Sequence, residues 1–227
     1  MLYRGGCVVY VNWGRYSDDM NYETISLSSW QKISDVLTKR LKQLEADNVP
    51  GDNMFMYGYS VGGRIAIHSG LKFGKRKIAN IDACDNAGPG FYAYGLFHNP
   101  RNAAKNVQCI HTSAVLGTIA YDCHQDWLMG RCGSSQAGAN FGMWLLCQTG
   151  FCPQAEEAIL SHDLCNEFYI SAFENDFVAD NRNNCNGVLK KEDLPPNYKM
   201  GFMETRRSPS IKGKIAAPTT KDYPFNV

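Results

Sequence analysis

The stretch MFMYGYSVGGRIAIH, residues 54–68, contains the pattern that decides the fold of this chain. Its first four residues are apolar, as in a strand buried in a parallel sheet, and residues 64–68 are predicted to form a helix. Between them lies Gly58-Tyr59-Ser60-Val61-Gly62, a G-x-S-x-G pentapeptide. In a strand–turn–helix context this pentapeptide predicts a strained turn, flanked by small residues, that lifts a serine hydroxyl off the edge of the sheet. Ser60 is therefore the candidate nucleophile, and the Val61 N–H, at the helix N-terminus, is the candidate oxyanion donor.

Strand and helix patterns also precede this stretch. Residues 7–13 form a short apolar run typical of a strand buried on both faces in a parallel sheet. An amphipathic helix, predicted to end near residues 48–51, is indicated by apolar residues at largely three- and four-residue steps: Ile25, Ile33, Val36, Leu37, Leu41 and Leu44.

Further elements follow the serine. They are two strands at 78–83 and 107–111, a helix around 154–173, and one or two late strands within 198–225. The alternation predicts an α/β fold, with a mostly parallel sheet and helices on both faces. From about 113 to 155 the pattern dissolves into a long loop region, in which Trp127, Phe141 and Trp144 read as exposed aromatics that could touch lipid, with buried packing as an equal alternative.

Length and charge narrow the class of protein. A chain of 227 residues fits one domain, which we place at 1–227. Its 23 basic residues nearly cancel its 22 acidic ones, so no long-range field favours nucleic acid or acidic lipid. The composition is that of a globular protein, and we expect no transmembrane segment.

Cysteine usage indicates an oxidising compartment. The chain has nine cysteines, at positions 7, 84, 109, 123, 132, 147, 152, 165 and 185. Zinc-finger spacing is missing, so we expect disulfides and neither a metal nor a cofactor. Residues 1–7 do not read as a signal peptide, and we expect the leader of a secreted protein upstream of them.

A serine nucleophile requires a histidine base and a carboxylate that orients it, in the chain order Ser, Asp, His for this fold. Two acids, Asp82 and Asp85, come close to the end of the next predicted strand. Five histidines compete for the base: His68, His98, His111, His124 and His162. His68 reads as a packed or surface residue, and His98 and His124 have no supporting context, whereas His162 precedes a helix and comes after Asp85 as this order requires.

A family resemblance sharpens these choices. Residues 78–91, IANIDACDNAGPGF, resemble the segment I-G-R-I-x-G-L-D-P-A-G-P-x-F of the pancreatic lipase family, which implies an α/β-hydrolase fold and the catalytic acid at Asp85. Asp82 would then be structural. Residues 161–169, SHDLCNEFY, are similar to S-H-x-R-x-x-x-Y-(Y/F), which implies that His162 is the base. His111 resembles the histidine of an I-H-T segment that is not the base.

The resemblance covers nearly the whole chain. Residues 11–13 look like V-D-W, with Asn12 in place of Asp, and Leu164 stands where the family has Arg. The loop region around 123–152 occupies the place of the family's lid, where Cys132 could pair with Cys147 or Cys152. Family members also carry early strands and an H-G-(F/G) loop, with a second oxyanion donor, before the position of Met1, so we expect the domain to be incomplete at its N-terminus.

The function implied is that of a secreted carboxylic ester hydrolase of the triacylglycerol lipase or phospholipase A1 type. Its substrate would be a glycerolipid or phospholipid at a lipid–water interface. Because the family includes insect yolk proteins, the alternative is a catalytically silent storage or lipid-binding protein.

Overall fold

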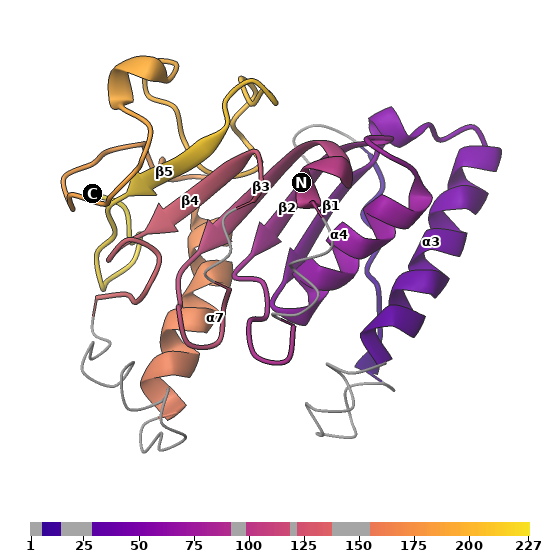
Figure 1. Cartoon of the computed structure of the whole chain (residues 1–227), viewed down its shortest axis with the longest axis horizontal. Coiled ribbons are helices and arrows are strands. Elements are labelled where there is room, and N and C mark those ends of the chain that lie inside the picture. The colour runs from indigo at the N-terminus through magenta and orange to yellow at the C-terminus, as the bar shows by residue number, and fades with distance from the viewer. Residues whose placement is uncertain (1–5, 15–28, 92–98, 119–121, 138–154) are drawn as a thin grey trace.

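The computed structural model describes residues 6–14, 29–91, 99–118, 122–137 and 155–227. In the last segment, side chains are described from residue 158 onward. Its centre is a five-stranded sheet in which every neighbouring pair is parallel and the strands follow chain order (Figure 1). The strands are β1 Phe55–Tyr59, β2 Ile78–Cys84, β3 Ala104–His111, β4 Gln125–Met129 and β5 Gly213–Ala217. The predicted α/β class with a parallel sheet is confirmed.

Helices lie on both faces of the sheet. α3, Trp30–Ala46, and α4, Val61–Phe73, belong to one face, and α7, Ala155–Ser171, belongs to the other. On the first face Ile81 and Ala83 of β2 pack in one core with Leu41 of α3. On the second face Cys84 packs in another core with Phe168 of α7. Successive residues of a strand point to opposite faces, so these two cores are separated by the sheet. Among the described residues there are also three short 3-10 turns: η3 Gly51–Asn53, η4 Pro100–Asn102 and η5 Lys191–Asp193.

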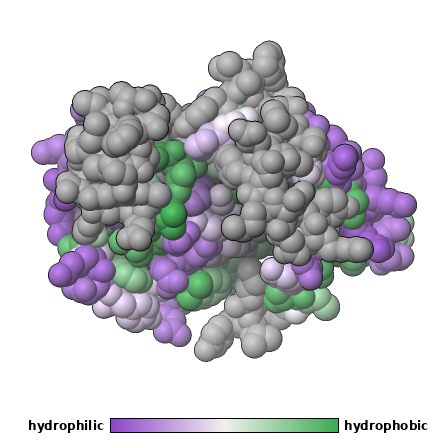
Figure 2. Space-filling view, turned by 90° about the horizontal axis from the view of Figure 1, so that it is seen from below, coloured by the Kyte–Doolittle hydropathy of each residue, from purple (hydrophilic) through white to green (hydrophobic). Residues whose placement is uncertain are grey.

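The register of β1 and β2 brings two strand ends together. Tyr59, the last residue of β1, pairs with Cys84, the last residue of β2. Ser60 and Asp85 each come directly after these partners, so both lie at the carboxyl edge of the sheet, where α/β proteins place their ligands. Figure 2 views the molecule from below Figure 1 and shows hydrophobic residues between hydrophilic ones on that side.

Three expectations about apolar residues are wrong. Residues 7–13 are not in a strand, and Val9 and Tyr10 are 74% and 86% exposed, because no neighbouring strand among the described residues accepts their backbone hydrogen bonds. Val36 points to solvent from α3, although Ile33 is buried as expected. Trp127 is fully buried, because it lies on β4, a strand that the loop prediction for residues 113–155 missed. Phe141 and Trp144 lie outside the described residues.

In the described ranges three disulfides join separate segments: Cys84–Cys165, Cys109–Cys123 and Cys132–Cys185. The expected pairing of Cys132 with Cys147 or Cys152 is wrong, because the turn after β4 carries Cys132 against the loop that holds Cys185. Cys147 and Cys152 lie outside the described residues. Within the part of the chain that the structure covers, no helix is long and apolar enough to cross a membrane.

Candidate active site

Ser60 occupies a tight turn between β1 and α4. Its φ of 54° lies in the left-handed region, which is costly for a residue with a side chain and persists only where the surroundings enforce it. The Ser60 N–H donates to the carbonyl of Cys84 at 2.9 Å, which ties the turn to the end of β2. Ser60 remains partly exposed at the edge of the sheet.

The glycines around Ser60 differ in what they permit. A Cβ on Gly58 would lie 2.3 Å from the backbone oxygen of Gly62, so the strand and the helix can approach only if residue 58 is glycine. A Cβ on Gly63 would lie 2.0 Å from Oδ1 of Asn86. Gly62, by contrast, faces open space. The steric requirement therefore falls on Gly58 and Gly63, and the second glycine of the pentapeptide is not needed for space.

His162 lies on α7 with its ring between the serine and an acid. Its Nε2 is 2.9 Å from Oγ of Ser60, and its Nδ1 is 2.6 Å from Oδ2 of Asp85. The side chain is buried, and the ring of Tyr59 packs against it with 4.7 Å between centroids. The structure thus joins the three residues singled out from the sequence in one hydrogen-bonded chain. This geometry suits a base that is oriented by a carboxylate and that accepts the serine proton.

Asp85 is fully buried, and hydrogen bonds hold its carboxylate in place. Oδ1 accepts the backbone N–H groups of Thr112 at 2.9 Å and Ser113 at 3.2 Å, which leaves Oδ2 to His162. A Cβ on Gly117 would lie 2.4 Å from Oδ1, so the loop after β3 closes tightly over the acid. Sequence reasoning missed Thr112 and Ser113. The available signal was that they directly follow β3, the strand next to β2.

Val61 is the first residue of α4. At this position the backbone N–H has no acceptor within the helix, and the helix dipole favours negative charge nearby. The side chain is buried against Phe91 and Trp30 in a small core, which fixes the direction of the turn. Donation by Val61 to an oxyanion stays a prediction.

Asp82, the rival acid, belongs to a different group of contacts. It is fully buried in β2, accepts a hydrogen bond from the Tyr169 hydroxyl at 2.6 Å and forms an ion pair with Arg207. Burial, with the nearby Asp82 charge second, raises the pKa of Tyr169 well above its ordinary value, so this phenol stays a donor. Asp82 joins β2 to α7 and to the C-terminal segment, as its structural interpretation implied.

The other described histidines have partners elsewhere. His111 is buried with Nε2 3.2 Å from Asp126, and the ring of His68 packs edge-on against Trp30. His124 accepts the Val107 N–H at Nδ1. His98 lies outside the described residues.

One group of potential metal ligands occurs in the described ranges, formed by Cys109, Cys123 and Asp126. The two sulfurs are joined in a disulfide, so they do not offer thiolates to a metal.

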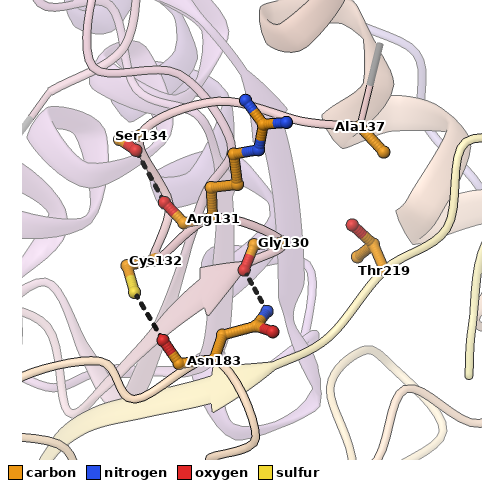
Figure 3. Close-up of a pocket in the computed structure, with 7 residues that line it drawn as sticks. All are labelled: Gly130, Arg131, Cys132, Ser134, Ala137, Asn183 and Thr219. Atoms are coloured by element: carbon orange, nitrogen blue, oxygen red, sulfur yellow. Dashed lines mark hydrogen bonds between the residues drawn. The ribbon is translucent and has the colours of Figure 1, made fainter. Parts of the chain in front are cut away.

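A cavity of about 550 Å³ opens beside the end of β4. Figure 3 shows its seven lining residues: Gly130, Arg131, Cys132, Ser134, Ala137, Asn183 and Thr219. Their polar atoms largely bond to one another, as Asn183 Nδ2 does to the Gly130 carbonyl at 2.6 Å. None of the seven belongs to the Ser60–His162–Asp85 chain. Gln136, the residue before the lining residue Ala137, donates its backbone N–H to Oγ of Ser161, the residue before His162.

No family model matches this chain, and no curated protein is similar enough to it to count as a match.

Proposed function

We propose that this chain is a serine carboxylic ester hydrolase of the α/β-hydrolase fold. The observation that carries the proposal is the hydrogen-bonded order Ser60 Oγ, His162 Nε2, His162 Nδ1, Asp85 Oδ2, with distances of 2.9 and 2.6 Å across its two links. A serine on a strained turn, a buried imidazole and a buried carboxylate are the parts that acyl transfer requires.

In the proposed reaction Ser60 Oγ attacks the ester carbonyl carbon while His162 Nε2 takes the hydroxyl proton. The negative charge that develops on the carbonyl oxygen is stabilised by the N–H of Val61 at the N-terminus of α4. His162 then gives the proton to the leaving alcohol, and an acyl-serine remains. Water, deprotonated by the same imidazole, attacks the acyl group, releases the carboxylic acid and restores Ser60. Asp85 keeps the Nδ1 proton in place throughout.

We infer that the substrate class is a neutral glycerolipid or a phospholipid, cleaved by a triacylglycerol lipase or phospholipase A1 type of reaction. The support is the likeness of residues 78–91 and 161–169 to the pancreatic lipase family. We also propose that the protein is secreted, because three disulfides fit an oxidising compartment.

A fluorophosphonate probe tests the proposal directly, since it reacts with an activated serine and releases fluoride. We expect the unaltered chain and the surface control Ser210→Ala to be labelled, and Ser60→Ala to stay unlabelled with an unchanged circular dichroism spectrum. Labelling that persists in Ser60→Ala would contradict the assignment. An unaltered chain that is folded and never labelled would favour the alternative, a catalytically silent lipid-binding or storage protein. Product analysis on triolein and phosphatidylcholine emulsions then separates the two proposed activities.

A further inference from the structure

Cys84 is connected to all three residues of the candidate site. Its backbone carbonyl accepts the Ser60 N–H at 2.9 Å, and its peptide bond leads directly to Asp85. Its sulfur is bonded to Cys165 of α7, the helix that carries His162. One strand-end residue thus touches the serine turn, the acid and the helix of the base.

Cys165 lies close to the base along the helix. It follows His162 by three residues, so the two side chains lie on the same side of α7, about one turn apart. Both cysteines are completely buried, and the bond joins residues that are 81 positions apart in the chain. It therefore anchors the helix to the sheet at nearly the level of the imidazole.

Two other polar links hold the same side of α7 farther along the helix. The Tyr57 hydroxyl donates to Asn166, and the Tyr169 hydroxyl donates to Asp82. These links secure the packing of α7 on β1 and β2 without the disulfide. Next to His162, the Tyr59 hydroxyl donates to Asp163 and the Gln136 N–H donates to Ser161. The disulfide is the covalent link at this level of α7, and it joins the helix to the end of β2.

We propose that the Cys84–Cys165 disulfide is a positioning element for the base, which sets the distance of His162 from both Ser60 and Asp85. The inference rests on the proposed function. Nε2 and Nδ1 must stay within hydrogen-bond reach of groups carried by two different strand ends, and a shift of about 1 Å in such a geometry costs as much as about 100-fold in rate. The disulfide limits this shift because it joins the helix to the residue between the serine turn and the acid.

The test compares two variants of the full chain, each of which lacks one disulfide. Cys84→Ala/Cys165→Ala removes the proposed positioning bond, and Cys132→Ala/Cys185→Ala removes a control bond that spans 53 positions. For each, the labelling rate constant with a fluorophosphonate, and kcat and KM on a short-chain p-nitrophenyl ester, are measured per folded molecule. We expect the first variant to lose about 10- to 100-fold in labelling rate and kcat with little change in KM, and the control to stay within about twofold of the unaltered chain.

The outcomes separate the inference from the proposed function. Equal labelling rates in the two variants would overturn the positioning role, because loss of stability alone affects both. Failure to label the unaltered chain would overturn the proposed function, and the inference with it. If the double alanine variant does not fold, Cys84→Ala/Cys165→Val, which restores part of the lost volume, replaces it, and the same loss of labelling rate is expected.

Discussion

Replacing Asp85 by asparagine is expected to remove nearly all turnover while leaving the fold in place. Oδ2 of Asp85 accepts the Nδ1 proton of His162 at 2.6 Å, so Nε2 is free to accept from the Ser60 hydroxyl. An amide nitrogen in place of Oδ2 donates instead, which moves the imidazole proton to Nε2 and removes the acceptor that Ser60 needs. This wrong tautomer lowers kcat by about 10⁴-fold in serine proteases, which corresponds to about 5 kcal/mol.

The stability of the Asp85→Asn variant should change little. The amide oxygen can still accept the backbone N–H groups of Thr112 and Ser113, which Oδ1 accepts now. Residue 85 has a φ of 39°, and asparagine tolerates positive φ better than most residues. The loss is therefore limited to weaker hydrogen bonds, about 1–2 kcal/mol in the free energy of unfolding.

Asp82→Asn, three residues earlier, is the matched control: it is expected to lower the stability of the fold and to leave turnover nearly unchanged. This change leaves the buried Arg207 guanidinium without a charged partner, which typically costs about 3–5 kcal/mol. The Asp82 carboxylate accepts hydrogen bonds from Tyr169 and Arg207, outside the Ser60–His162–Asp85 chain, so kcat per folded molecule should stay near that of the unaltered chain.

Urea unfolding and kcat on a short-chain p-nitrophenyl ester, measured at matched folded concentrations, separate the two effects. The Asp85 variant should be stable and inactive, and the Asp82 variant unstable and active. If Asp82→Asn lowers kcat per folded molecule more than Asp85→Asn does, the roles assigned to the two acids are wrong.

Two further changes test the turn and the pH dependence of stability. Gly58→Ala should lower the free energy of unfolding by about 1–3 kcal/mol, because the new Cβ clashes with the Gly62 carbonyl. Gly62→Ala should be neutral or stabilising by up to about 1 kcal/mol. Thermal melts in which Gly62→Ala is the less stable of the two would contradict the steric argument. Burial, followed by the charges of Arg76, Arg101 and Lys212, lowers the pKa of His124 to about 4. Between pH 6.5, the ordinary pKa of histidine, and about pH 4, this ring is therefore neutral in the folded protein and protonated in the unfolded chain. The stabilisation from the neutral His124 ring is thus complete above pH 6.5 and is lost as the pH falls toward 4, by about 2 kcal/mol between pH 7 and pH 5. His124→Asn keeps an acceptor for the Val107 N–H and should remove most of this difference in the free energy of unfolding, measured in urea. Equal losses between pH 7 and pH 5 in both proteins would refute the role of His124.

Local pattern was enough for the elements that surround the candidate site. The apolar run before Gly58 is β1, the segment after Ser60 is α4, and the strands predicted at 78–83 and 107–111 are β2 and β3 with small shifts at their ends. Each of these elements can be recognised from the spacing of its apolar residues and from the residues that flank it, all within about ten positions of the chain. The order of Ser60, Asp85 and His162 along the chain also followed from the motifs, and the approach of Ser60 to Asp85 followed from parallel strands that end at one edge.

Contacts between residues far apart in the chain decided the rest. The burial of Trp127 depends on β4 being flanked by β3 and β5, and the exposure of residues 7–13 depends on the lack of a hydrogen-bonded neighbour among the described residues. Composition predicted disulfides, but their pairing required knowing that Cys84 of a strand faces Cys165 of a helix 81 positions later. Periodicity records only which side of an element is apolar. The packing of the helices on the sheet determines which residues cover the apolar side and which cysteines pair.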